Sequence, residues 1–532
     1  MSTFPNTPLL SADKLYQLLA SRFTNGYKKL KDIPSPTLLK NSKKAAERIA
    51  KAIINKERIT LIGDYDVDGV TSTSIMVLFF REINYPLTAI IPNRFCDGYG
   101  INANVLQRVE ADLVLTVDNG ITAVEAAEIC KERGIDLIIT DHHTPSQNLP
   151  DAYAIVNPKL PDCTYPFKEI CGAQVAWLLL GAVKKELELD IDMRQYLDLV
   201  ALAVIADVMP LYDVNRAIVQ EGLKQMMLSQ RPSSIIIRDF LNKQTISSED
   251  IAFAIAPRIN SAGRLEDASI ALDFLTASTI EKAAKQFEIL NDLNNIRKAT
   301  EADTTENACL HVNENDKIIV VAGENWHEGV VGIVASRLVS RFKKPAIVFN
   351  IHEGVAKGSA RSVGEVDIFS LIHTQRELLE KFGGHKMAAG LSLHISNLEL
   401  FKSAINKEAQ KVDPNDFIPQ EAILGELEGD AINFELLNIL EKFEPYGEGN
   451  PRPRFLINNA ELLHVKLFGA DKSHSRLGIR LKPFDRQTIE IVAFRQVLEV
   501  PEDKKITCSY TVSKNVFNGK TSIQLMLDNI YH

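Results

Sequence analysis

The sequence predicts several domains: two α/β domains followed by a C-terminal β-barrel. Between residues 40 and 210, short apolar runs alternate with helical segments, as in a doubly wound parallel sheet. A second α/β pattern begins near residue 317 and continues to about residue 410. The β-rich runs that follow lack helical segments between them, which is typical of a small barrel. A chain of 532 residues is long enough for several such domains, each with its own core.

The first α/β pattern can be divided into strands and helices. The expected strands are residues 59–63, 87–91, 113–117, 137–140 and 154–156, and the expected helices are residues 45–54, 71–82, 173–187 and 197–205. Gly69 is expected to let the chain turn sharply into the helix that begins at Thr71. Strands that alternate with helices in this way form a sheet whose strands all run parallel.

The rest of the chain divides where the pattern changes. Residues 216–310 lack strand patterns and are expected to be helical, with a long connecting helix from Ser278 to about Leu310. A break rich in Asp and Pro at residues 412–416 precedes the barrel. The predicted domains are residues 1–215, which include an N-terminal extension, and residues 216–315, 316–412 and 413–532.

The composition is that of a globular protein of the cytoplasm. The hydrophobic fraction is 45% and the charged fraction is 24%. The N-terminus lacks the basic and apolar regions of a secretory signal, and no apolar run could cross a bilayer, so we expect no membrane partner. The six cysteines are dispersed without a CxxC pair, which favours a reducing compartment over a disulfide framework or a thiolate zinc site.

The charge distribution is more informative than the net charge. A net charge of −9 argues weakly against a nucleic-acid partner, but a metal site concentrates carboxylates that its ions later neutralise. Residues 331–390 contain nine Lys and Arg against five Asp and Glu, which gives this stretch a charge of +4. It is either a surface for an anionic partner or an ordinary solvated surface.

Acidic residues and histidines follow three of the predicted strands. The carboxyl ends of parallel strands meet at one edge of a sheet, so these side chains should converge on one crevice. Carboxylate and imidazole ligands gathered in this way suit divalent ions such as Mn²⁺ or Mg²⁺. The residues are Asp64, Asp66, Asp68, Asp118, Asp141, His142 and His143.

Two further observations support a metal site. The DxDxDG pattern also occurs in EF-hands, but these need a Glu at loop position 12, where this chain has Ile75. Asp207 lies in the apolar run from residue 203 to residue 210, and a carboxylate in such surroundings needs a partner. We therefore add Asp207 to the candidate ligands.

These motifs resemble the four motifs of the DHH phosphoesterase superfamily in residue type, order and spacing. They are Asp64-Tyr65-Asp66-Val67-Asp68-Gly69, Val117-Asp118-Asn119-Gly120, Asp141-His142-His143 and Asp207. Residues 358–362 and 383–390 are similar to motifs of a DHH-associated domain, and residues 443–451 are similar to a segment near an OB-fold. The resemblance covers nearly the whole chain. Within the superfamily it is to bacterial single-strand-specific 5′→3′ DNA exonucleases.

The resemblance implies a fold and a metal centre. The fold would be a doubly wound DHH domain, a helical connector, a smaller α/β DHH-associated domain and a C-terminal OB-fold barrel. Two divalent ions, Mn²⁺ or Mg²⁺, would be bound. One would be held by Asp66 and Asp118, and the other by Asp68, Asp118, His142 and Asp207. His143 would contact the scissile phosphate, and Asp141 would orient the histidines.

The chain departs from the superfamily pattern at one expected metal ligand, and the resemblance also implies a set of substrate contacts. Many members have a His where this chain has Ile62, so Asp64 or water is expected to replace that ligand. Residues 358–362 offer amides, hydroxyls and a guanidinium for phosphate. The expected substrate-binding residues are Arg94, Tyr99, Arg258, Asn260, Arg264, Ser359, Arg361, Ser362, Gly384 and His385. Three aromatic rings of the barrel could stack on bases, although core packing is the favoured role for each: Phe468, Phe484 and Phe494.

The activity implied by the resemblance is hydrolysis of single-stranded DNA to 5′-mononucleotides from a free 5′ end, in DNA repair and recombination. A single-strand-binding protein and a helicase are candidate partners. Three alternatives stay open: a DHH enzyme acting on short oligonucleotides or cyclic dinucleotides, an inactive DHH scaffold that binds DNA or replication proteins, and a manganese inorganic pyrophosphatase. The barrel region disfavours the first, the complete ligand set the second, and the chain length the third.

Overall fold

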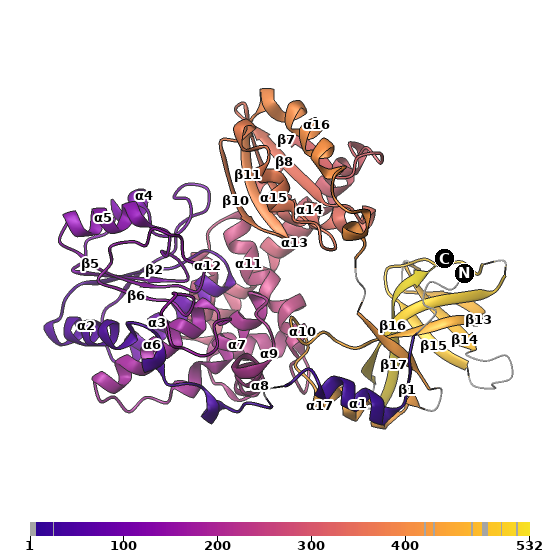
Figure 1. Ribbon diagram of the computed structural model, residues 1–532. Coiled ribbons are helices and arrows are strands. Elements are labelled where there is room, and N and C mark those ends of the chain that lie inside the picture. The colour runs from indigo at the N-terminus through magenta and orange to yellow at the C-terminus, as the bar shows by residue number, and fades with distance from the viewer. Residues whose placement is uncertain are drawn as a thin grey trace. The chain divides into compact units, whose positions relative to one another are not determined.

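The computed structural model describes residues 7–531, except residues 25, 420–421, 429–430, 470–471, 481–487, 502 and 518–519. The chain divides into two compact units (Figure 1). The larger unit contains Pro34–Met209 and Glu221–Gln420. The other, here the barrel unit, contains Met1–Ile33, Pro210–Gln220 and Glu421–His532.

The larger unit begins with the predicted parallel sheet. Its described strands run in the order β3-β2-β4-β5-β6, all parallel. They are β2 (Ile59–Ile62), β3 (Thr88–Ile90), β4 (Leu113–Val117), β5 (Asp136–Thr140) and β6 (Ala154–Val156). The chain leaves β2 for β3 on one side and returns for β4 on the other, so the strand order reverses between β2 and β4. Ligand sites of open α/β sheets lie at such a reversal.

Helices cover both faces of this sheet, which confirms the doubly wound fold. Figure 1 shows α4 and α5 over one face and α2, α3 and α6 over the other. The helices are α2 (Ser42–Asn55), α3 (Val67–Glu82), α4 (Ala103–Leu106), α5 (Val124–Glu132), α6 (Gly172–Glu186) and α7 (Leu197–Ala206). α3 begins four residues earlier than predicted, because the Asp66 side chain accepts a hydrogen bond from the Gly69 amide and caps the helix. Gly69 therefore lies inside the helix, where a Cβ would come 2.5 Å from the Asp64 carbonyl oxygen.

A helical region follows, as the sequence predicts. Its helices are α8 (Asp213–Leu228), α9 (Pro232–Leu241), α10 (Ser248–Asp250), a π-helical turn (Ile251–Ile255), α11 (Ala256–Leu265), α12 (Ser269–Leu275) and α13 (Ile280–Leu310). The predicted long helix is α13, which has 31 residues and is capped by the Thr279 hydroxyl. Among the residues that the structure describes, no helix has both the length and the apolar character needed to span a membrane.

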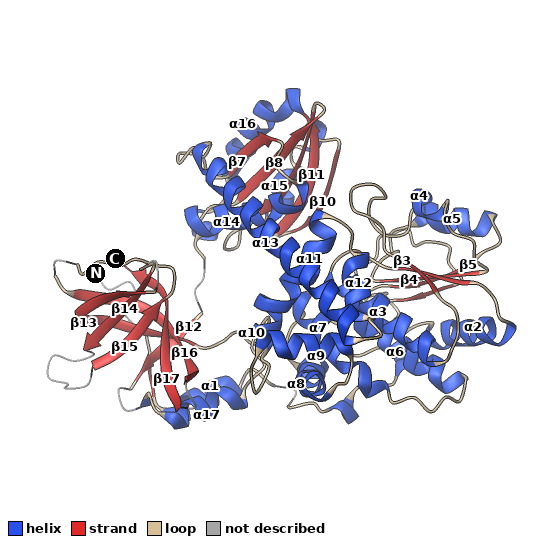
Figure 2. Cartoon of the chain, turned by 180° about the vertical axis from the view of Figure 1, so that it is seen from behind, coloured by secondary structure: helices blue, strands red, loops and turns tan. Residues whose placement is uncertain are grey.

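The second α/β domain of the larger unit is built on a mixed sheet in the order β10-β11-β9-β8-β7 (Figure 2). The strands are β7 (Ile319–Glu324), β8 (Ala346–His352), β9 (Val355–Arg361), β10 (Lys381–His385) and β11 (Ala388–His394). The helices are α14 (Glu328–Phe342), α15 (Ile368–His373) and α16 (Leu398–Ala409). Alternate residues of β7 and β8 belong to two different apolar clusters, so the sheet has a core on each face.

The barrel unit contains the predicted closed barrel. Its described strands are β12 (Ile423–Leu427), β13 (Arg454–Phe468), β14 (His474–Arg480), β15 (Thr488–Ala493), β16 (Lys505–Phe517) and β17 (Lys520–Tyr531). They follow the order β12-β13-β14-β15-β17-β16, and the pairing of β13 with β16 closes the barrel. A helix, α17 (Phe434–Lys442), connects β12 to β13.

The N-terminus belongs to this barrel unit, which differs from the predicted division of the chain. β1 (Leu9–Leu10) pairs in parallel with β12. The helix that follows, α1 (Ala12–Ala20), buries Leu15 and Leu19 in the barrel unit's core. Residues 1–33 and 210–220 were expected in or beside the first α/β domain. A strand of two residues whose partner lies more than 400 residues away leaves no local pattern by which to place it.

Candidate active site

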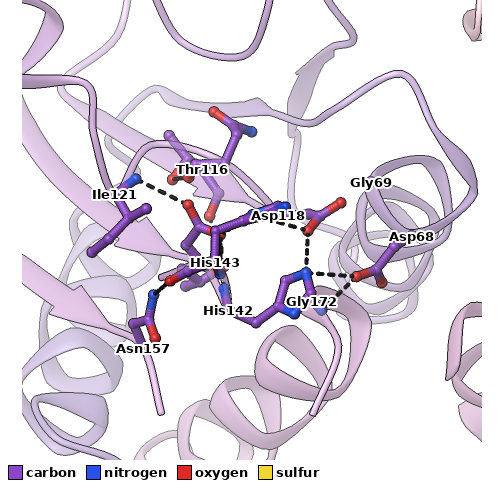
Figure 3. A network of polar contacts seen from close by, with 12 residues as sticks. Asp68, Gly69, Thr116, Asp118, Ile121, His142, His143, Asn157 and Gly172 are labelled. Carbon is purple, nitrogen blue, oxygen red and sulfur yellow. Dashed lines mark hydrogen bonds and ion pairs between the residues drawn. The ribbon is translucent and has the colours of Figure 1, made fainter. Parts of the chain in front are cut away.

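The acidic residues and histidines meet at the carboxyl edge of the parallel sheet, beside the reversal of strand order (Figure 3). Asp64 follows β2, Asp118 directly follows β4, and Asp141 directly follows β5. Asp207 is the residue that ends α7. The topology thus brings together side chains that lie up to about 140 residues apart in the sequence.

Asp68 is fixed by the first turn of α6. Its two carboxylate oxygens accept hydrogen bonds from the amides of Gly172, at 2.6 Å, and Ala173, at 2.8 Å. A helix N-terminus carries a partial positive charge, which stabilises this carboxylate although it is buried. Gly172 also has no room for a side chain, since a Cβ would lie 2.7 Å from the Asp118 Cβ.

Asp118 is held in an unusual backbone conformation. Its φ of 61° lies in the left-handed region, which costs little for Asp compared with most residues. The neighbouring Asn119 secures this turn: its amide donates to the carbonyls of Ile62, at 3.1 Å, and Val117, at 2.9 Å. Its oxygen accepts from the Ile101 amide. Asn119 therefore joins the ends of β2 and β4 to the loop that follows β3.

Asp141 contacts both histidines that follow it. One oxygen accepts from the amides of His142 and His143 and lies 2.7 Å from His143 Nδ1, and the other accepts from the Ile121 amide. Burial alone would raise the pKa of Asp141, but the bond and charge of His143 and the amide donors hold it below its usual value. Burial would lower the pKa of His143, but Asp141 outweighs this effect and raises it to about 9. In the absence of cations, Asp141 therefore favours the protonated form of the His143 ring.

His142 lies among three carboxylates. Its Nε2 is 3.2 Å from Asp118 Oδ1, 3.5 Å from Asp207 Oδ2 and 3.6 Å from Asp68 Oδ2. Burial lowers the pKa of His142, so its ring is neutral and able to ligate a cation.

Several buried polar atoms in this cluster lack a hydrogen bond. Within the described part of the chain, these atoms include both ring nitrogens of His142, Asp118 Oδ1 and Asp207 Oδ2. Unpaired buried polar atoms are costly, and bound cations would satisfy them. Within the described residues, three groups have ligand atoms close enough to share an ion: Asp64 with Asp66 and Asp118, Asp68 with His142 and Asp207, and Asp118 with His142 and His143. The donor set, oxygen with one or two imidazoles, fits Mn²⁺ or Mg²⁺.

The raised pKa values of these carboxylates also indicate a cation site. Burial, and then the neighbouring carboxylates, raise the pKa of Asp64 and Asp118 well above the usual value and that of Asp207 to about 9. Burial also raises the pKa of Asp68. In the absence of cations the cluster therefore binds protons, and cations would have to displace them.

A group of arginines lies beside the cluster. The Arg94 guanidinium lies over the Tyr65 ring, 4.3 Å from its centroid. Arg264 donates to the Gly329 carbonyl, at 3.1 Å, and Arg361 donates to Ser359 Oγ, at 2.9 Å. Burial lowers the pKa of Arg264 to about 10, and the charges of nearby arginines, Arg94 and Arg361 among them, add to this shift. Partly buried cations that repel one another in this way can form a receptor for an anion.

The other predicted substrate contacts have varied surroundings. The Tyr99 ring meets Tyr65 edge-on at 6.0 Å, next to the arginines. Arg258 lies over Phe240 and donates to Asn291, and Ser362 donates to the Val366 carbonyl. Asn260 is half-buried on α11, whereas Gly384 and His385 are exposed on β10, at the edge of the second sheet.

Sequence reasoning missed two residues of this site, Asn157 and Lys159. Asn157 is fully buried and donates to the His143 carbonyl at 2.9 Å, and its oxygen accepts from the Lys159 amide (Figure 3). Lys159 is close enough for its charge to favour the ionised form of Asp207. Both residues follow β6 at the same edge of the sheet, so polar residues after the predicted strand at 154–156 were the signal that could have revealed them.

Three family models and several known proteins match this chain. Residues 58–204 match the DHH family N-terminal domain, residues 315–411 the DHHA1 domain, and residues 423–529 the RecJ OB domain. Two similar proteins are named single-stranded-DNA-specific exonuclease RecJ. The chain is 33% identical to that of Haemophilus influenzae, over 99% of its own length and 96% of the relative's. It is 37% identical to that of Bacillus subtilis over 93% of its own length, and spans 64% of that protein.

The chain belongs to the RecJ family. A crystal structure of RecJ from Thermus thermophilus in complex with Mn²⁺ matches with a TM-score of 0.80 and 31% identity, over 93% of this chain and 72% of that one. The same protein in complex with Mg²⁺ matches with a TM-score of 0.75 and 30% identity, over 93% and 70% of the two chains. The expected domain types and the expectation of Mn²⁺ or Mg²⁺ are thus confirmed.

Proposed function

We propose that this RecJ protein degrades single-stranded DNA from the 5′ end and releases 5′-mononucleotides, with two Mn²⁺ or Mg²⁺ ions as cofactors. The observation that supports the proposal best is the proximity of a cation site and an anion receptor. The charge of Asp66, a candidate ligand, acts on Arg264, which belongs to the arginine group. A terminal phosphate held by the arginines would bring the first phosphodiester to the cations, so that one nucleotide is released at a time.

The candidate ligands divide between the two ions. Asp64, Asp66 and Asp118 would hold one ion, and the other would be held by Asp68, Asp118, His142 and Asp207. When bound, the ions supply a hydrolytic nucleophile and neutralise the charge that develops on the phosphate.

His143 has a separate role in this proposal. Asp141 engages its Nδ1, and its side chain is 48% exposed, so Nε2 carries a proton toward the open side of the site. With Asp141 engaged at Nδ1, a proton on Nε2 can be donated in a hydrogen bond to an oxygen of the scissile phosphate. Asn157 positions the ring by donating a hydrogen bond to the His143 carbonyl.

The arginines and their neighbours would bind the strand. Arg94, Arg264 and Arg361, with Ser359, are proposed to hold the 5′-terminal phosphate. The proposed contacts along the rest of the strand are Tyr99, Arg258, Asn260, Ser362, Gly384 and His385.

The barrel is proposed to bind single-stranded DNA as well. Phe468, His474 and Phe494 form a cluster with ring centroids 5.2–6.0 Å apart, and Arg476 lies over Phe468. Phe494 is 46% exposed, which favours base stacking over core packing for this ring. Phe484 lies outside the described residues.

The remaining expectations are also proposals. All six cysteines are free, which supports the predicted cytoplasmic location. A role in DNA repair and recombination, with a single-strand-binding protein and a helicase as partners, follows from the family alone.

Labelled strands test the polarity. A strand with a 5′ label should release it at once as a mononucleotide, whereas a 3′ label should appear only after nearly complete digestion. Arg361→Gln should reduce the preference for a 5′-phosphate over a 5′-hydroxyl end, because it removes a guanidinium from the anion receptor. Early release of the 3′ label, or an unchanged end preference in Arg361→Gln, would contradict the proposal.

A further inference from the structure

The loop that follows β3 presents an exposed aromatic ring beside the arginine group. The loop leaves the parallel sheet at its carboxyl edge, the same edge that holds the cation site. Phe95 lies in this loop directly after Arg94, and 43% of it is exposed. A single exposed apolar residue needs no explanation by itself. Its surroundings decide whether it has a role.

The loop holds Phe95 in a fixed position. The Asp97 carboxylate accepts from the Asn93 amide, at 2.9 Å, and from Arg108, at 2.8 Å. The Asn93 side chain accepts from the Phe95 amide, at 3.0 Å, and donates to the carbonyl of Glu266, the residue that ends α11, at 2.9 Å. A ring presented by such a loop loses little freedom when a ligand binds.

His327 supports the ring from the second α/β domain. The two rings meet edge-on, with centroids 5.5 Å apart and an interplanar angle of 84°. His327 caps α14, where its Nδ1 accepts from the Gly329 amide, and the carbonyl of Gly329 accepts from Arg264. Phe95 is therefore linked through two neighbouring residues to one arginine of the anion receptor.

Arg94 provides a second, independent link. It precedes Phe95 in the chain, and its charge adds to the effect of burial in lowering the pKa of His327. The exposed ring, its supporting histidine and two of the receptor's arginines thus lie together. A receptor made of guanidinium groups recognises the phosphate but not the nucleoside attached to it.

We propose that Phe95 binds the base of the 5′-terminal nucleotide by stacking, while the arginines hold the phosphate of that nucleotide. The inference rests on the proposed function and adds a base-binding subsite to it. Stacking on an aromatic ring tolerates all four bases, because each has a π-face. An exonuclease that removes every nucleotide in turn needs this kind of recognition. His327 acts as a positioning residue that fixes the orientation of the Phe95 ring.

Strands that differ only in their first residue provide the test. Two 5′-phosphorylated strands of equal length are compared, one with a normal terminal nucleotide and one with an abasic terminal residue. The full-length protein with saturating Mn²⁺ should have about a tenfold higher KM for the abasic end, the size of one lost stack. The kcat should not change, because stacking stabilises bound substrate and transition state equally.

Variants of Phe95 should alter the KM ratio between the abasic and the normal strand and leave kcat unchanged. Phe95→Ala should bind the normal strand as weakly as the wild type binds the abasic strand, and should no longer distinguish the two. Phe95→Trp should restore the distinction. The matched control is Phe253→Ala, which removes a phenylalanine that is 80% exposed on the helical connector and should behave as wild type.

The outcomes separate the inference from the function on which it rests. If Phe95→Ala keeps the wild-type preference for a base at the 5′ end, or weakens cleavage of both strands equally, the stacking subsite is wrong while the exonuclease proposal stands. If neither strand releases a 5′-mononucleotide with the wild-type protein, the proposed function itself fails.

Discussion

The burial of α1 in the barrel unit can be tested by one substitution in a single turn of that helix. Leu19 is fully buried in the core that contains Leu436, Leu440 and Phe443, whereas its neighbour Leu18 is 41% exposed. Leu19→Ala removes buried methyl groups and leaves a cavity, which should lower the free energy of unfolding of the barrel unit by about 3 kcal/mol. Leu18→Ala makes the same chemical change on the exposed side and should cost less than about 0.5 kcal/mol.

The two units can be observed separately because both tryptophans of the chain, Trp177 and Trp326, lie in the larger unit. Urea unfolding followed by tryptophan fluorescence reports the larger unit, and far-ultraviolet circular dichroism reports both. Leu19→Ala should move part of the dichroism transition to lower urea and leave the fluorescence transition where it was. A shift of the fluorescence midpoint, or equal effects of Leu19→Ala and Leu18→Ala, would refute the grouping of α1 with the barrel.

Three further predictions concern the metal centre. Asp118→Asn should abolish Mn²⁺-dependent hydrolysis, yet raise the melting temperature of the metal-free protein, because it removes a buried carboxyl that must bind a proton in the folded state; activity near wild type at saturating Mn²⁺ would exclude a bridging role. The metal-free protein should become less stable as the pH rises from about 4 to 9, since folded Asp207 keeps a proton, with a pKa of about 9, that the unfolded chain releases near its ordinary pKa. Saturating Mn²⁺ should flatten this dependence, and equal slopes in urea titrations with and without the ion would contradict the assignment. Asn157→Ala should lower kcat by about tenfold to a hundredfold with little change in KM, because His143 loses the bond to its carbonyl; a change in KM alone would count against a positioning role.

The sequence was sufficient where the information is local. The strands β2, β4 and β5 could be placed because each is a short apolar run that ends at an acidic residue. The convergence of these ends then follows from the geometry of parallel sheets alone. The resemblance added the roles of individual residues, and the structure gives Asp141 and His142 surroundings that suit those roles.

The structure was needed to identify contacts between residues far apart in the sequence and contacts made through backbone groups. The start of α3 depends on which side chain caps it, and an acid at both Asp64 and Asp66 leaves that choice open in the sequence. Asn157 acts through the carbonyl of His143, a contact for which neither residue carries a local pattern. The arginine group combines residues from a strand, a helix and a loop, so its members could be proposed individually but their mutual proximity could not.

The parallel pairing of β1 with β12 has a consequence for synthesis. A ribosome releases Leu10, Leu15 and Leu19 long before β12, the partner strand of β1, which begins at Ile423. At ordinary rates of translation these leucines wait roughly 20 to 80 s for it. The two α/β domains of the larger unit can fold during this interval, while the apolar side of α1 stays available to chaperones and proteases. α1 is thus among the last helices to be buried, and its protection from proteolysis would report that the barrel has formed.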